Sequence, residues 1–264
     1  MARFACMLVL LTVFAAPASA ADERGALLRA RQAYNQRDFD TAVAAADEAR
    51  RSPELAADAD LIAARALLER FREGAAPEDL SNARVRLRRL APGSFPPLER
   101  VEYLVGLGEA LYFDEAPGAA AALFDSVLES PDLPLVEGRE LVLDWWASAV
   151  EQQARPRAPF ERQPLYERVR ERMAEELARN PASGTAAYWA AAAARAQGDL
   201  HGAWDAARAG WVRALLIADG GAALRGDLDR LVQRGIIPER ARMLGQAADD
   251  LRDDWEAFKA RWSR

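Results

Sequence analysis

A five-residue phrase occurs three times in this chain and constrains its fold more than any other feature. The phrase is Asp, a large apolar residue, two further residues and Ala, and it begins at Asp38, Asp79 and Asp199. An Asp can cap the start of a helix, because its carboxylate accepts a hydrogen bond from a free backbone N–H. The Ala lets two helix axes approach closely, because its side chain is small. The phrase therefore predicts the turn between the two helices of a repeated unit.

The remainder of the chain is also typical of a helical protein. Ala, Leu, Arg and Glu, which are good helix formers, dominate the sequence. Few stretches alternate between apolar and polar residues as strands do. Pro and Gly interrupt the chain at intervals and leave segments of about one to two dozen residues, a usual length for packed helices. With 51% hydrophobic and 29% charged residues, the chain can bury a real core. We expect an all-α fold.

The spacing of several residues resembles that of a tetratricopeptide repeat. The residues that carry the resemblance are Leu107, Gly108, Leu111, Tyr112, Ala120, Phe124 and Pro131. Similar units lie near 24–53, 58–92, 98–131 and 183–212. The resemblance implies a TPR-like α-solenoid of about five helix pairs, formed by residues 21–264 as one domain. The family's usual Trp is Leu104 or Ala26 here, and the units are spaced more widely than the family's period of about 34 residues.

Residues 137–181 carry no clear repeat signature, although the spacing of the other units requires a further unit there. Within this region Trp145 and Trp146 are adjacent, so they cannot share one helix face, and we expect one of them to be partly exposed. Trp204 and Trp211 are seven residues apart and share a face, which predicts that both pack in the core.

The last segment, near 221–262, is expected to cap the stack of helices. Leu251, Trp255, Phe258 and Trp262 fall on one face of a predicted helix. Acidic residues gather at its N-terminus, where the helix dipole favours negative charge. We expect the aromatic face to pack on the final helix pair.

The N-terminus has the pattern of a secretory signal peptide over residues 1–20. Arg3 provides a positive charge, an apolar run follows from Phe4 to Ala16, and Ala18-Ser19-Ala20 is a small-residue cleavage site. Cleavage after Ala20 predicts a periplasmic or secreted protein, and the alternative is an uncleaved anchor. Cys6 is the only cysteine, so the mature chain would contain no disulfide and no thiolate. The net charge of −6 argues against nucleic acid as a partner.

No catalytic or metal-binding constellation is visible. His201 is the only histidine, whereas a metal site usually needs several converging ligands. Chance pairs of carboxylates are certain among 41 acidic residues, so such pairs carry no information. We therefore expect a non-catalytic protein without a metal or a cofactor.

The resemblance implies an inner groove, lined by the first helix of each pair, that holds a segment of another protein. Carried over to this chain, the groove residues are Arg31, Tyr34, Asn35, Val105, Glu109, Tyr112, Tyr188 and Arg195. The resulting hypothesis is a periplasmic scaffold that binds another envelope protein or peptide. Two alternatives stay open: a cell-wall-directed enzyme or ligand-binding protein on a helical scaffold, and a self-associating structural component of an envelope complex.

Overall fold

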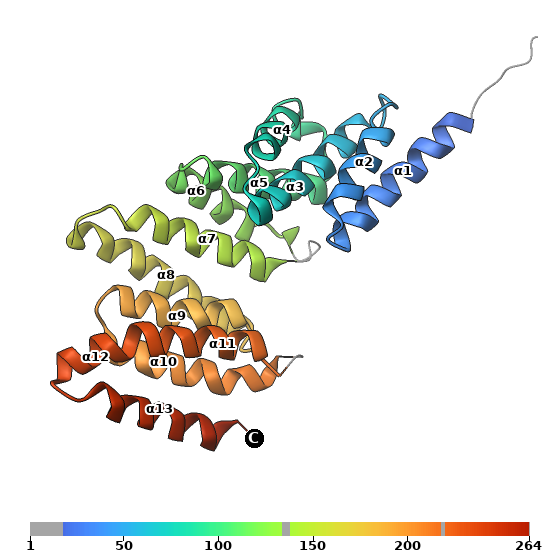
Figure 1. The fold of residues 1–264 in the computed structure, drawn as a ribbon. Helices are drawn as coiled ribbons and strands as arrows, with labels where there is room; N and C mark the ends of the chain where they lie inside the picture. The colour runs from blue at the N-terminus through green and yellow to red at the C-terminus, as the bar shows by residue number, and fades with distance from the viewer. Residues whose placement is uncertain (1–17, 134–137, 218–219, 264) are drawn as a thin grey trace, which may run out of the picture. The chain divides into compact units, whose positions relative to one another are not determined.

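The computed structural model describes residues 18–133, 138–217 and 220–263. Over these residues the chain is built from helices and contains no strand, which confirms the all-α prediction (Figure 1). The signal peptide prediction falls largely outside the described residues. The chain divides into two compact units, one up to Leu90 and one from Ala91 onwards. The prediction of a single repeat domain stays a prediction, and each unit is described by itself.

The first unit consists of four helices with an alanine-rich core. They are α1 (Ala18–Asn35), α2 (Phe39–Ala49), α3 (Ala56–Gly74) and α4 (Pro77–Leu87). Consecutive helices pack on one another, and α1 also contacts α3. Small buried residues allow close packing between α1, α2 and α3, among them Ala26, Ala30, Ala46, Ala49, Ala59 and Ala63. The buried carboxylate of Asp60 pairs with Arg50 and Arg86, so α3 is also held by charged contacts to its neighbours.

The second unit follows the same pattern over a longer stretch. Its first helices are η1 (Pro92–Ser94), α5 (Pro97–Phe113), α6 (Pro117–Leu128), α7 (Arg139–Ala154), α8 (Pro159–Arg179) and α9 (Gly184–Ala196). Then come α10 (Leu200–Arg213), η3 (Ala214–Leu216), α11 (Ala222–Leu231), the π-helical turn η4 (Val232–Ile236), α12 (Ile237–Leu244) and α13 (Ala248–Trp262). Besides sequence neighbours, α7 contacts α5 and α9, and α9 contacts α11. Helices α5, α7, α9 and α11 therefore lie next to one another in this order.

The repeated phrase begins a helix at two of its three positions. Asp38 accepts a 3.1 Å hydrogen bond from the backbone N–H of Thr41. Asp199 accepts a 2.8 Å bond from the N–H of Gly202. The phrase at Asp79 also follows a turn, between α3 and α4, but Asp79 does not cap the helix, because Pro77 occupies the first turn of α4 and starts that helix two residues earlier. Asp79 is instead buried and pairs with Arg70 of α3.

The region without a repeat signature contains the helices α7 and α8, which pack on each other. The prediction that Trp145 or Trp146 would be partly exposed is wrong, since both are buried. Trp145 packs edge-on against Tyr112, and Trp146 lies under the guanidinium of Arg172 at 5.6 Å. Because α7 has α6 on one side and α8 on another, two adjacent tryptophans can both be covered.

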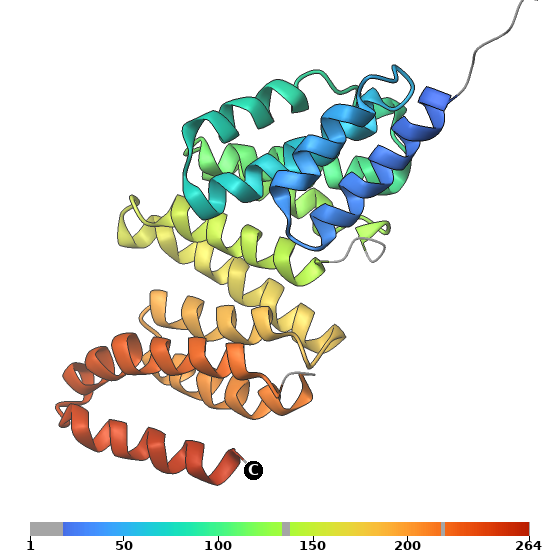
Figure 2. The ribbon, with the colours of Figure 1, turned by 45° about the vertical axis from the view of Figure 1, so that its right-hand side comes forward.

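The last helix, α13, packs against α10 and α12 (Figure 2). Trp255 is fully buried, and its ring lies 5.8 Å from that of Trp204 and 5.6 Å from that of Trp211. The core positions predicted for Trp204 and Trp211 are confirmed. Trp262, expected on the same buried face, is exposed instead, because it lies in the last turn of α13 and is not part of the buried cluster around Trp255.

Candidate binding groove

A groove of about 920 Å³ crosses one side of the second unit, and we call it the acidic groove. Four alternate helices contribute to its lining, namely α5, α7, α9 and α11, together with the turns that precede α9 and α11. The lining residues are Tyr112, Glu140, Leu141, Asp144, Ser148, Glu151, Gln152, Arg155, Asn180, Ala182, Gly184, Thr185, Tyr188, Trp189, Ile217, Gly221, Ala223, Leu224 and Asp227. The volume lies within the range of about 300–1,000 Å³ that is usual for binding pockets.

A polar stripe along α7 provides one wall of the groove. Glu140, Asp144, Ser148 and Glu151 follow one another at intervals of three or four residues, and such spacing places them on one helix face. Other faces of the same helix are apolar and buried, as Trp146 is. Helix α7 therefore separates a packed core from a polar, concave surface.

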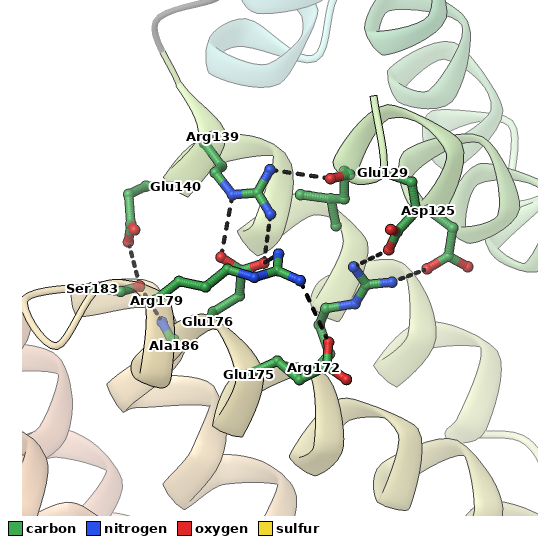
Figure 3. A network of polar contacts seen from close by, with 11 residues as sticks. Asp125, Glu129, Arg139, Glu140, Arg172, Glu175, Glu176, Arg179, Ser183 and Ala186 are labelled. Atoms are coloured by element: carbon green, nitrogen blue, oxygen red, sulfur yellow. Dashed lines mark hydrogen bonds and ion pairs between the residues drawn. The ribbon is translucent and has the colours of Figure 1, made fainter. Parts of the chain in front are cut away.

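The start of α7 is held by adjacent residues that reach different neighbours (Figure 3). Arg139 donates bonds of 3.2 and 2.6 Å to the buried carboxylate of Glu176 in α8, and a 3.1 Å bond to the carbonyl of Leu128. The next residue, Glu140, accepts bonds from the hydroxyl of Ser183 at 2.9 Å and from the N–H of Thr185 at 3.1 Å. The first turn of α7 is thereby fixed to α8 and to the start of α9.

The same network continues to α6 (Figure 3). Arg172 of α8 donates a 2.6 Å bond to Glu129 and lies 3.5 Å from Asp125. The hydrogen bond and the positive charge of Arg172 lower the pKa of Glu129. Arg179 donates a 3.2 Å bond to Glu176, so this buried carboxylate accepts hydrogen bonds from the guanidinium groups of both Arg139 and Arg179. These pairs hold α6, α7 and α8 together and thus support the wall of the groove.

Two tyrosines and a tryptophan provide the aromatic surface of the groove. Tyr112 packs edge-on against Trp145, with the ring centroids 5.0 Å apart. Trp189 donates a 2.7 Å hydrogen bond from its indole N–H to Asp144. Tyr188 packs edge-on against Trp189, with ring centroids 5.6 Å apart. These contacts position the rings before any ligand binds.

The surroundings of Tyr188 are negatively charged. Burial raises the pKa of the Tyr188 hydroxyl, the charges of Glu151, Asp227 and Asp144 raise it further, and the charge of Arg195 acts in the opposite direction. The pKa of Tyr112 is also raised, chiefly by burial, while Arg155 acts in the opposite direction. The lining contains four carboxylates and only one cation, Arg155, so the groove favours positive charge.

The structure brings together two of the predicted groove residues, Tyr112 and Tyr188. Val105 and Glu109 belong to the same helix as Tyr112 but are buried, with 1% of their surface exposed, so they do not line the groove. Val105 is part of the apolar core formed with residues of α6 and α7. The repeat register carried over to α5 thus includes positions that its neighbours cover.

Arg195 points to a different contact. Its guanidinium donates bonds of 3.1 and 2.5 Å to Glu239 of α12. A Cβ atom at Gly235, in the π-helical turn η4, would come within 2.8 Å of Arg195, so the absence of a side chain there leaves space for the guanidinium. The remaining predicted residues, Arg31, Tyr34 and Asn35, lie on α1 of the first unit and are not part of the acidic groove.

The repeat pattern does not predict the groove residues of α7, because their region carries no repeat signature. A signal was nevertheless present, since Glu140, Asp144 and Ser148 recur every four residues beside two tryptophans. That pattern is typical of a helix with one polar and one buried face. It does not reveal that the polar face is concave, because concavity depends on the neighbouring helices.

The described residues contain no group of three or more His, Cys, Asp or Glu side chains arranged to hold a metal ion. His201 is exposed at the start of α10 and lies 3.5 Å from Asp205. In the part of the chain that the structure describes, no helix has both the length and the apolar character needed to cross a bilayer. Comparison with protein-family models, curated proteins and solved structures gives no match to this chain.

Proposed function

We propose that this chain is a TPR-like helical scaffold that binds an extended segment of another protein in the acidic groove. The observation that carries the proposal is the composition of the groove lining. Its residues come from α5, α7, α9 and α11 and from the turns before α9 and α11, but not from the alternating helices α6, α8 and α10. In a TPR-like repeat, the first helix of each pair lines the inner surface.

The helix contacts fit a stack of helix pairs. Every consecutive pair of helices from α5 to α10 packs together, and α7 also contacts α5 and α9, the helices two positions away on either side. Stacked helix pairs of this kind bury their apolar faces only against neighbouring pairs. With α1 to α4 forming two further pairs, the chain would contain about five, followed by α11 to α13.

The chemistry of the groove suits a peptide rather than a reaction. Aromatic residues such as Tyr and Trp supply much of the affinity at protein interfaces, and polar groups around them give specificity. Tyr112, Tyr188 and Trp189 are placed in this way among carboxylates and amides. Two of the carboxylates, Glu140 and Asp144, already accept hydrogen bonds within the protein, which gives them a positioning role.

We further propose that the protein acts in the bacterial envelope after cleavage of residues 1–20. Helix α1 begins at Ala18, so the cut would fall in its first turn. The intact mass of the protein isolated from its source cells tests this point. A mass corresponding to Ala21–Arg264 supports export, and a mass that includes Met1–Ala20 contradicts cleavage.

Site-specific photo-cross-linking tests the groove assignment. A photoreactive amino acid would replace Ser148 or Ala223 in the groove, and Ala122 or Ala174 on α6 and α8 as controls. The proposal predicts cross-links to a second polypeptide from the groove positions and not from the controls. Equal cross-linking from both sets, or cross-linking from the controls alone, would contradict it.

A further inference from the structure

We infer that the acidic groove recognises a Lys or Arg side chain of an extended polypeptide segment, bound between Asp144, Glu151 and Asp227 beside Tyr188. This inference rests on the proposed function and specifies the chemistry of the partner. The three carboxylates come from two helices, α7 and α11, and all line the same groove. Carboxylates on a concave surface focus a negative potential, which attracts cations and repels acidic segments.

The three carboxylates have capacity for a ligand. Asp144 accepts the indole N–H of Trp189, but a carboxylate offers about four acceptor positions. Glu151 pairs with Arg155 at 3.2 Å, and the Arg155 side chain is 68% exposed. Asp227 pairs with Arg230, which is also well exposed. Exposed ion pairs of this kind are weak, so a ligand cation can replace them.

The aromatic rings favour the same ligand. A guanidinium or ammonium group is attracted to the face of an aromatic ring within about 6 Å of its centre. Tyr112, Tyr188 and Trp189 all line the groove, so a long basic side chain entering it meets both rings and carboxylates.

A random-peptide display selection on the purified protein tests the inference. Selected peptides would be measured against a groove variant, Tyr112→Ala with Tyr188→Ala, to identify those bound in the groove. The same peptides would then be measured against the charge variant, which combines Asp144→Asn, Glu151→Gln and Asp227→Asn. Asn at 144 retains an oxygen to accept the Trp189 bond, so this variant is designed to keep its fold.

The matched control removes three negative charges elsewhere. It combines Asp250→Asn, Asp253→Asn and Asp254→Asn, all exposed residues of α13. We expect groove-dependent peptides to be enriched in Lys or Arg. They should bind the charge variant at least ten times more weakly than the parent, and the control variant with the same affinity as the parent. A free polyamine such as spermidine should compete only weakly, because it lacks the backbone of an extended segment.

The experiment distinguishes a failure of the inference from a failure of the proposed function. Groove-dependent peptides without basic residues, or with unchanged affinity for the charge variant, overturn the inference and leave the proposed function standing. If all selected peptides bind the groove variant and the parent with equal affinity, or if no peptide is selected, both the inference and the proposed function are overturned. If the charge variant does not fold, the affinity of the parent protein for the peptides is measured at low and at high salt instead. Ion pairing predicts that the affinity falls as the salt concentration rises. An affinity that does not change with salt would overturn the inference.

Discussion

The indole N–H of Trp189 donates a 2.7 Å hydrogen bond to the carboxylate of Asp144, and this bond ties α9 to α7 within the acidic groove. Trp189 is mostly buried, with 8% of its surface exposed. Asp144 therefore has two separable properties: it accepts the bond of a nearly buried donor, and it contributes negative charge to the groove.

Substitution of Asp144 should separate these two properties. We expect Asp144→Ala to lower the free energy of unfolding by about 1–2 kcal/mol, because the indole N–H loses its acceptor. Asp144→Asn keeps an acceptor and should change stability by less than about 0.5 kcal/mol. Urea denaturation followed by tryptophan fluorescence measures both, since all seven tryptophans lie in the second unit. Equal stability of the two variants would show that the bond has no structural role.

The ion-pair network behind α7 gives a second prediction. Glu176 is buried and accepts bonds from Arg139 and Arg179. We expect Glu176→Ala to destabilise the protein by about 3 kcal/mol, because Arg139 loses its partner carboxylate and is left with its bond to the carbonyl of Leu128. The neighbouring Glu175 is exposed and lies 4.0 Å from Arg179, so Glu175→Ala should cost less than about 1 kcal/mol. A similar cost for both substitutions, measured by urea denaturation, would contradict the importance given to the network.

The contact between Asp229 and α13 predicts a pH dependence. Burial alone would raise the pKa of Asp229, but hydrogen bonds from Lys259 and Trp255 lower it below its ordinary value of 3.8. A lowered carboxylate pKa stabilises the folded state above the unfolded pKa, and this stabilisation is lost as the pH falls through the folded pKa. Asp229→Asn, which keeps an acceptor for Trp255, should therefore lower stability at pH 7 and lose that effect in acid, below about pH 4.

The expected difference at pH 7 is about 0.5–1 kcal/mol, because the Asp229 side chain is 37% exposed and solvent screens its charge. At the alkaline end, burial would lower the pKa of Lys259, but bonds to Asp229 and Glu256 raise it above 10.5. The difference in stability between the parent and Asp229→Asn should thus persist until the pH rises above the pKa of Lys259. Stability curves of the parent and the variant across pH check this, with Asp253→Asn as an exposed control. A difference that stays constant down to pH 2 would refute it.

A close approach between α5 and α6 gives a fourth prediction. A side chain at Gly108 would come within 2.5 Å of the fully buried ring of Phe124. We expect Gly108→Ala to destabilise the protein by about 1–3 kcal/mol, despite the better helix propensity of Ala. Gly226 in α11 has only an ordinary contact at 3.7 Å, so Gly226→Ala should be neutral or stabilising by up to about 1 kcal/mol. Thermal unfolding compares them, and two stabilised variants would contradict the packing described.

The features that the sequence predicts correctly depend on local rules. Asp38 and Asp199 cap helices because the donor N–H lies only three residues away. Helical periodicity alone predicts that Trp204 and Trp211 lie in the core, and both contact Trp255. Asp79 shows the limit of such rules, since a proline two residues earlier determines where the helix begins.

The groove could be predicted only in part, because it depends on which helices become neighbours. Tyr112 and Tyr188 follow from the repeat pattern, but the acidic residues come largely from α7, where the pattern is absent. The repeat register predicts that Arg195 lies in the groove, yet its guanidinium bonds to Glu239 and lies against Gly235 of the π-helical turn. Such contacts between helices distant in sequence leave no periodic signal.

A charge-reversal cycle tests most directly whether the acidic groove recognises a basic side chain. It uses a selected peptide with a single Lys, its Lys→Glu counterpart, the parent protein and Asp227→Lys. We predict that Asp227→Lys weakens binding of the Lys peptide at least about tenfold, or 1.4 kcal/mol, and strengthens binding of the Glu peptide relative to the parent. Equal affinities of the parent and Asp227→Lys for both peptides would contradict the account.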